Sequence, residues 1–294
     1  MDQPAEVRAR FDAVLGEPVE LSRREDRWLA LGADVIGFAA VDARGWARLV
    51  AEGRLLVRWR AAGVPAPRVL DERAALRVQV RDRLHGLTGE AIEPLLFGGA
   101  PPDARGRFAD DAPLSRFGAR LAASYGELAA QIHAAVPAAD PLASALGPRA
   151  PMDIDAALAA LRDDPSVTAA TIEAVARAMP WLAATPPATA VIHGDLHFHN
   201  LCLSADGTIT GVFDLGDAGG DAPEADLQYA HSLGPRFVAV AVHAYRRPLD
   251  MNAIRRAHLR TALTHILWHG PGTPRHRSIV AWIEAAFAAL AIGP

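Results

Sequence analysis

The chain contains no lysine, so all 30 of its basic side chains are arginine. Any mechanism that needs an amine side chain is therefore excluded. Cysteine is nearly absent as well. The single Cys202 cannot form an internal disulfide, and its apolar neighbours Leu201 and Leu203 favour a small buried side chain over a nucleophile.

Long hydrophobic runs are also missing. The sequence has no uninterrupted apolar stretch of about 18 residues, the length that spans a bilayer. Its opening, MDQPAEVRAR, has neither the basic nor the apolar region of a secretory signal. We therefore expect a cytoplasmic protein without a membrane partner.

The composition that is present is typical of a globular protein. The 294 residues are enough for one large or two medium domains, and 51% of them are hydrophobic while 22% are charged. A formal net charge of -4 argues against nucleic acid as the main partner. The oligomeric state stays open.

Hydrophobic periodicity predicts a small sheet followed by a helix in the first part of the chain. Residues 17–41 contain three short β-branched or aromatic segments separated by charged or glycine-containing turns, which indicates antiparallel strands. Residues 46–62 have the apolar spacing of a helix that ends at Gly63. Residues 76–80 then alternate between apolar and charged or polar side chains, as a half-buried strand does.

From about residue 113 the pattern becomes helical, with a stripe running to Ile132. Further helices are expected at 153–163, 166–179, 250–269 and 275–291. The proline-rich residues 136–151 indicate an internal loop. We therefore expect an α+β fold with a small N-terminal lobe, 1–85, and a larger, mostly helical C-terminal lobe, 86–294.

One segment, 191–227, concentrates polar side chains that could carry chemistry. Four of them alternate at spacings of two: His193, Asp195, His197 and His199. If they converge on a metal ion, the protein is a metallohydrolase. Such a site needs further ligands, and the remaining pair at helical spacing, His265 and His269, more often marks a helix face. This stays the weaker alternative.

The same segment fits the catalytic loop of a kinase. The spacing His193-x-Asp195-x-x-x-x-Asn200 is that of an aspartate that accepts the hydroxyl proton of the substrate and an asparagine that binds magnesium. Two strand-like runs around the turn SADG predict a hairpin that brings Asp214 back beside Asn200. Two such oxygen ligands suit Mg²⁺, which keeps waters and phosphates at its other positions.

In these motifs the chain resembles the aminoglycoside phosphotransferase and choline kinase-like family. Members carry a His-Gly-Asp-x-x-x-x-Asn loop, a hairpin, an aspartate in a strand, a Gly-Asp-rich turn and an Asp-Leu pair. The corresponding pieces here are His193-Gly194-Asp195, Asn200, Asp214, GDAGGDAPEADL and Asp226-Leu227. The resemblance extends over residues 17–290 and is strongest in 191–227.

The resemblance implies a bilobal protein-kinase-like fold that transfers the γ-phosphate of ATP or GTP to a hydroxyl of a small molecule, with antibiotics among the candidate acceptors. It implies that Asp195 is the catalytic base, that Asn200 and Asp214 bind Mg²⁺, and that Asp226 braces the catalytic loop. His193 is expected to be a buried structural residue. Resistance and metabolic roles both stay open.

The helix at 46–62 carries an acid inside its apolar stripe. Glu52 lies on the same row as Leu49 and Leu56, and a buried carboxylate needs a partner. In kinase-like folds this glutamate pairs with a strand lysine that grips the α- and β-phosphates. The best-aligned position for that lysine is Gly37, so the usual partner is missing.

The glycine-rich phosphate loop is missing too, because the first strand turn reads SRREDR. We therefore predict that Arg23, Arg24 or Arg27 turns inward over the phosphates, since a guanidinium binds them in a bidentate way. Phosphotransferases acting on viomycin and capreomycin tolerate a non-lysine residue at this strand position, and the chain is expected to be nearest to them. A catalytically impaired nucleotide-binding relic is the alternative.

The acceptor is not determined by the sequence. Residues 231–294 hold eight arginines against only Asp250 and Glu284, which is unlike a receptor for a polycation. The tract 138–190 is acidic and could still line a cationic pocket.

Overall fold

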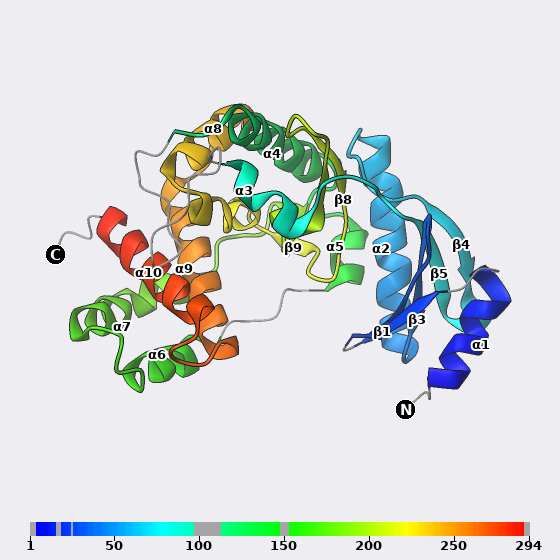
Figure 1. Ribbon diagram of the computed structural model, residues 1–294, viewed down its shortest axis with the longest axis horizontal. Coiled ribbons are helices and arrows are strands. Elements are labelled where there is room, and N and C mark those ends of the chain that lie inside the picture. The colour runs from blue at the N-terminus through cyan, green and yellow to red at the C-terminus, as the bar shows by residue number, and fades with distance from the viewer. Residues whose placement is uncertain (1–3, 16–18, 25, 97–112, 148–152, 291–294) are drawn as a thin grey trace.

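The computed structural model describes residues 4–15, 19–24, 26–96, 113–147 and 153–290 (Figure 1). Its N-terminal part is built around an antiparallel sheet with the strand order β1-β2-β3-β5-β4. The strands are β1 (Glu20–Arg23), β2 (Arg27–Leu31), β3 (Val35–Ala40), β4 (Val69–Arg73) and β5 (Val78–Asp82). Helix α1 (Pro4–Leu15) packs on one face of this sheet, and helix α2 (Ala43–Ala61) packs on the other.

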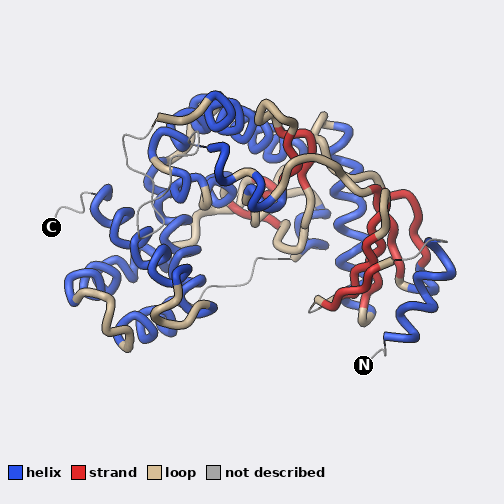
Figure 2. The backbone as a smooth tube through the Cα atoms, viewed as in Figure 1, coloured by secondary structure: helices blue, strands red, loops and turns tan. Residues whose placement is uncertain are grey.

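The C-terminal part is mostly helical (Figure 2). Its helices are α3 (Glu93–Leu96), α4 (Arg116–Ala135), α5 (Pro141–Leu146), α6 (Ile154–Arg162), α7 (Ala169–Ala183), α8 (Pro235–Tyr245), α9 (Met251–Trp268) and α10 (Pro274–Leu290). Two short antiparallel ribbons complete it, one of β6 (Ala190–Ile192) with β9 (Gly219–Asp221), the other of β7 (Leu201–Leu203) with β8 (Ile209–Val212). Short 3-10 helices are η1 (Ala74–Leu76), η2 (Gly89–Ala91), η3 (Phe198–Asn200), η4 (Pro223–Leu227) and η5 (Ala230–Leu233).

The predicted α+β architecture is confirmed, and the helices expected from periodicity correspond to α2, α4, α6, α7, α9 and α10. Two expectations need correction. The expected loop at 136–151 contains the short helix α5, capped by Asp140, while 148–151 lie outside the described residues. Strand β5 is buried on both faces rather than half-buried. Helices α1 and α8 were not foreseen. The lobe division at 85 stays a prediction.

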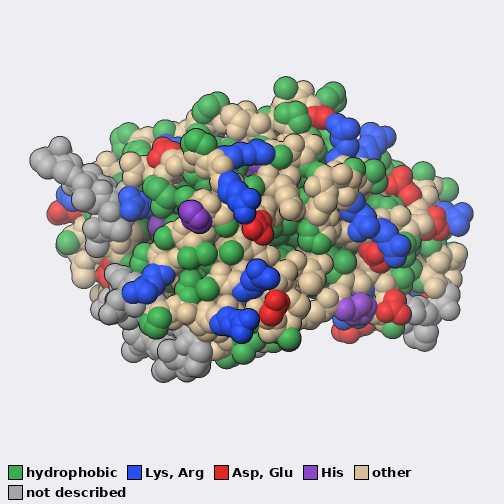
Figure 3. Space-filling view, turned by 90° about the horizontal axis from the view of Figure 1, so that it is seen from above, with side chains coloured by type: hydrophobic (Ala, Val, Ile, Leu, Met, Phe, Trp, Pro, Cys, Tyr) green, Lys and Arg blue, Asp and Glu red, His purple; other side chains and the backbone are tan. Residues whose placement is uncertain are grey.

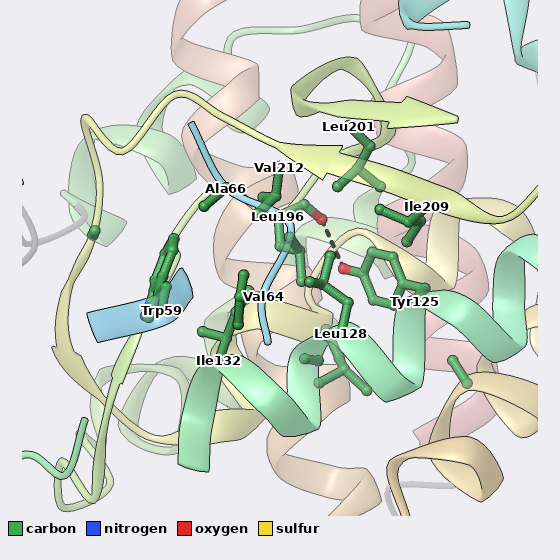
Figure 4. Close-up of a cluster of buried hydrophobic side chains, with 14 of the residues drawn as sticks. Trp59, Val64, Ala66, Tyr125, Leu128, Ile132, Leu196, Leu201, Ile209 and Val212 are labelled. Atoms are coloured by element: carbon green, nitrogen blue, oxygen red, sulfur yellow. Dashed lines mark hydrogen bonds between the residues drawn. The ribbon is translucent and has the colours of Figure 1, made fainter. Parts of the chain in front are cut away.

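The main hydrophobic core joins helix α2 to the C-terminal part (Figure 4). Trp59 of α2 is fully buried and shares this cluster with Ile132 of α4 and Val212 of β8. The hydroxyl of Tyr125 on α4 lies 2.7 Å from the Leu196 carbonyl oxygen (Figure 4) and 2.6 Å from that of Asp226, so its single proton is shared between these two acceptors. Helix α2 is therefore anchored in the larger part of the molecule.

A second cluster lies away from the sheet and is formed by α6, α7, α9 and α10. Among the described helices, none has the length and apolar character needed to cross a membrane. On the face shown in Figure 3, arginine and carboxylate side chains of the described residues lie interspersed among apolar ones.

Candidate active site

The predicted catalytic loop connects β6 to β7 and is closed by a side-chain contact. The Asn200 amide nitrogen donates hydrogen bonds to the Asp195 backbone oxygen, at 2.9 Å, and to its carboxylate oxygen Oδ2, at 2.8 Å. Asn200 is buried and Asp195 is partly exposed. With its amide nitrogen engaged in this way, Asn200 keeps its oxygen Oδ1 as the group that can accept a cation.

The hairpin β7–β8 brings Asp214 next to this loop, as predicted. Leu201 pairs with Val212 across the ribbon, and the Phe213 nitrogen donates to the Asn200 carbonyl oxygen at 3.0 Å. Asp214 follows directly, is exposed, and has a φ of +63°, which is rare for a residue other than glycine. Such backbone strain is characteristic of ligand-binding positions.

Arg48 of helix α2 holds the loop that follows Asp214. Its Nη2 group donates to the carbonyl oxygens of Gly216, at 3.0 Å, and Ala218, at 2.7 Å. A longer contact of 3.4 Å reaches the Leu215 carbonyl oxygen. The loop next to Asp214 is therefore tied to the N-terminal part of the molecule.

The fully buried Asp226 braces the catalytic loop. Its carboxylate accepts hydrogen bonds from the backbone nitrogens of His193, at 2.8 Å, and Gly194, at 2.6 Å, and from His133 Nε2 at 2.9 Å. Burial opposes ionisation, but the bond to His133 and these backbone donors outweigh it, so the pKa of Asp226 is lowered. The aspartate is thus held as an anion that fixes the start of the loop.

Gly194 allows the close approach that this loop needs. Its φ is +84°, and a Cβ atom there would lie 2.1 Å from the Asp217 carbonyl oxygen. Any side chain would force apart the catalytic loop and the segment that follows Asp214.

His193 is fully buried, as expected of a structural residue, and its Nδ1 accepts a hydrogen bond from the Asp195 backbone nitrogen at 3.3 Å. Its Nε2 lies 2.9 Å from the Phe213 carbonyl oxygen, and its ring stacks on Trp59 with centroids 6.0 Å apart. His197 instead stacks on His199, at 4.9 Å between centroids.

Within the part of the chain that the structure describes, no group of three or more His, Cys, Asp or Glu side chains could hold a metal ion. The metallohydrolase interpretation therefore lacks its ligand set.

Glu52 finds arginine partners, as the lysine-free sequence requires. Arg27 of β2 forms a bidentate pair with it, with both N–O distances at 2.8 Å, and Arg81 of β5 donates from Nη2 at 2.9 Å. Arg48 Nε lies 3.5 Å from the carboxylate. Burial alone would raise the pKa of Glu52, but the charge of Arg81 and the bonds from Arg27 lower it to about 2.

Among the three arginines named from the strand turn, only Arg27 turns inward. It is 8% exposed, whereas Arg23 and Arg24 lie at the surface. The Arg23 guanidinium lies 5.7 Å from the ring centroid of Trp28.

The assignment of the lysine position to Gly37 is wrong, because this residue faces the other side of the sheet. A Cβ atom on Gly37 would lie 2.7 Å from Phe11 of helix α1, so a longer side chain there would point away from Glu52. The cations that face Glu52 stand instead on the two strands that flank β3: Arg27 on β2, and Arg81 on β5, where it pairs with Ile36 of β3.

Arg81 and Gln79 were missed as buried groups. Both lie on the charged or polar side of the alternating segment, and the structure covers that side with helix α2. The Gln79 amide donates to the Leu49 carbonyl oxygen at 3.1 Å. The available signal was Glu52 itself, since an acid within an apolar stripe requires a cation on the facing strand.

A pocket of about 900 Å³ opens beside Asp195 and Asn200. Its wall carries neutral rings, because burial, together with the charge of His199, lowers the pKa of His197 to about 3, and burial and Arg275 lower that of His265 to about 4. Charged side chains of both signs line it as well: Asp153, Asp217, Asp221, Glu224, Arg256, Arg260 and Arg275.

The arrangement agrees with comparisons to known proteins. The GDP complex of aminoglycoside 2'-phosphotransferase-IIIa is similar over 98% of this chain and 100% of its own, with a TM-score of 0.63 and 16% identity. The macrolide 2'-phosphotransferase MphH from Brachybacterium faecium is similar over 99% of both chains, with a TM-score of 0.55 and 20% identity. The ADP-bound aminoglycoside phosphotransferase APH(2'')-Ib gives a TM-score of 0.57 and 15% identity over 97% of both. These likenesses confirm the kinase-like fold.

Sequence comparison identifies the family to which the chain belongs. No curated protein sequence is significantly similar to the chain. The model of the phosphotransferase enzyme family, however, matches residues 42–259, which include helix α2, the catalytic loop and the first half of helix α9. The match covers well over half of the chain, which therefore belongs to the phosphotransferase enzyme family.

Proposed function

We propose that this protein transfers the γ-phosphate of ATP or GTP to a hydroxyl of a small molecule bound in the pocket beside Asp195. The observation that carries the proposal is the hydrogen-bonded set of Asp195, Asn200 and the adjacent Asp214. In this proposal the Asp195 carboxylate orients the acceptor hydroxyl and accepts its proton, because it lines the pocket and is hydrogen-bonded to Asn200 beside Asp214.

The donor set fits magnesium. Asn200 Oδ1 and the exposed Asp214 carboxylate are oxygen ligands, which Mg²⁺ prefers, and they leave room for waters and phosphates. The ion would neutralise charge on the transferred phosphoryl group. Glu52 and Arg27, with Arg23 and Arg24 nearer the surface, are proposed to shape the nucleotide side of the site.

Antibiotics are the first acceptors to test, since similar structures contain kanamycin or streptomycin, or are macrolide kinases. The pocket here carries three arginines from α9 and α10 and also five carboxylates, Asp153, Asp195, Asp217, Asp221 and Glu224. Its charge therefore favours neither class, and both macrolides and polycationic aminoglycosides belong in the acceptor panel. The resemblance to the viomycin and capreomycin enzymes that we expect from the sequence adds these two antibiotics to the panel.

The experiment is an acceptor panel with Mg²⁺ and either ATP or GTP, followed by mass spectrometry of the products. A phosphorylated acceptor is expected from the native chain, and Asp214→Asn should remove it. Asp71→Asn, on the exposed strand β4, is a matched control that should leave transfer unchanged. If the native chain binds nucleotide but yields no product with any acceptor, the relic alternative replaces this proposal.

A further inference from the structure

We propose that Arg81 of strand β5 takes the place of the missing lysine and grips the nucleotide phosphates, while Arg27 serves to fix Glu52. The inference rests on the proposed function and identifies the residue that holds the phosphate chain. It also relocates the phosphate-binding cation from strand β3 to its neighbour.

Arg27 has little hydrogen-bonding capacity left for a ligand. A guanidinium has five N–H groups. In Arg27, Nε and one N–H of Nη2 donate to Asp26, both at 2.8 Å, while Nη1 and the second N–H of Nη2 donate to Glu52 at the same distance. One N–H therefore stays available, and the two carboxylates already offset the charge of Arg27.

Arg81 is in the opposite situation. Its Nε donates to Gln79 Oε1 at 2.7 Å and its Nη2 to Glu52 at 2.9 Å. The other three N–H groups, including both on Nη1, have no partner among the described residues. Arg81 is only 3% exposed as a whole, yet its Nη1 atom is not among the fully buried atoms that lack a partner, so it keeps contact with solvent. The Nη1 group is therefore accessible to an incoming anion.

The surroundings hold the Arg81 guanidinium in one orientation. Its central carbon lies 4.4 Å from the ring centroid of Phe38, a cation–π contact that fixes the plane of the group. Gln79 and Glu52 fix two of its edges. A guanidinium group that is already held in one orientation loses less conformational entropy when it binds a phosphate.

Arg81 also lies on the side of the site where phosphates are expected. Its Nη2 group contacts Glu52, whose carboxylate also lies 3.5 Å from Arg48 Nε, and Arg48 Nη2 donates to the backbone that follows Asp214. Arg81 is therefore connected through Glu52 and Arg48 to the loop that carries the proposed metal ligand.

The ligand class is a nucleoside diphosphate or triphosphate, and the contribution of Arg81 should depend on the phosphates alone. We would measure by calorimetry the affinities of adenosine and Mg·ADP for the native chain, Arg81→Gln, Arg81→Lys and Arg73→Gln. Arg73 is an exposed arginine of the same sheet, paired with Asp71 at 2.7 Å. Guanosine and Mg·GDP replace this pair of ligands if the enzyme prefers GTP.

We expect Arg81→Gln to weaken Mg·ADP binding about tenfold or more while adenosine affinity stays within about twofold, and Arg73→Gln to change neither. Arg81→Lys should recover part of the loss, because it restores the charge without the fork. Native-like affinity for Mg·ADP in folded Arg81→Gln would overturn the inference.

A separate result would identify a failure of the proposed function. If the native chain itself binds neither ligand, the nucleotide assignment fails before any variant is compared, and the inference falls with it. If the Arg81 variants do not fold, a crystal structure of the native chain with Mg·ADP decides. Arg81 Nη1 within hydrogen-bonding distance of a phosphate oxygen is expected, and a phosphate chain held by Arg27 alone would contradict the inference.

Discussion

The two buried carboxylates on either side of the site are stabilised by different kinds of partners. Asp226, beneath the catalytic loop, is bound by two backbone N–H groups and one histidine. Glu52, opposite the sheet, is bound by the guanidinium groups of Arg27 and Arg81. Backbone donors are fixed by the local chain path, whereas long side chains can reach one point from several strands.

This difference explains why the catalytic loop keeps the motif spacing of the family, whereas the strand lysine that usually pairs with the helix glutamate is replaced by arginines on other strands. The backbone contacts of Asp226 require the loop His193-Gly194-Asp195 to follow one path. The cation beside Glu52 can stand on any strand whose side chain reaches the carboxylate, and here it stands on β2 and β5. Loss of the strand lysine is therefore compatible with a structured site.

The largest effect is expected on turnover, from a substitution in the catalytic loop. Asp195→Asn removes the proposed proton acceptor while the hydrogen bond to Asn200 can still form, so turnover should fall by about 10²- to 10⁴-fold. Nucleotide affinity, measured by calorimetry, should stay close to native, because the phosphates are proposed to bind on the other side. Turnover that survives this substitution would remove Asp195 from the mechanism.

Removal of the Glu52 charge, which binds Arg27 and Arg81, should act mainly on the stability of the protein. Glu52→Gln leaves Arg27 and Arg81 buried without their shared counter-ion, and removal of one partner from such a network costs about 3–5 kcal/mol. The free energy of unfolding from urea titration measures this cost. The exposed pair of Arg177 and Glu173 is the control, since Glu173→Gln should change stability by less than about 1 kcal/mol.

Low pH should reveal the contribution of Glu52 to stability. The pKa of Glu52 falls from 4.5 to about 2 on folding, so its stabilising contribution is present above pH 4.5 and is lost as pH falls through about 2. This shift corresponds to about 3 kcal/mol. Between these pH values, unfolding free energy should therefore decline more steeply in the native chain than in Glu52→Gln. Parallel curves would mean that Glu52 does not titrate in this way.

Of the substitutions at the two buried carboxylates, Asp226→Asn is expected to cause the smaller loss of stability. The amide oxygen can still accept from one backbone nitrogen, so the variant should lose about 1–3 kcal/mol of stability, less than Glu52→Gln. Turnover should fall through displacement of the catalytic loop, while nucleotide affinity is retained. A larger stability loss than that of Glu52→Gln would reverse the comparison.

The sequence predicted the contacts between residues that lie close together along the chain. Asp195, Asn200 and Asp214 meet because a short hairpin returns the chain to the same place. Arg81 could not be identified from its own segment, because alternation separates the two faces of a strand without indicating that both are covered. Helix α5 was hidden because Asp140 and Pro141 start it within a proline-rich stretch, where such residues also form turns.

Arg48 contacts both sides of the site, so we expect ligand binding on one side to be coupled to binding on the other. It lies 3.5 Å from Glu52 and donates to the backbone that follows Asp214, so a shift of helix α2 also shifts the proposed metal-binding loop. If magnesium tightens nucleotide binding by some factor, nucleotide must tighten magnesium binding by the same factor. Shortening Arg48 should reduce both factors together and leave the affinity for each ligand alone less affected.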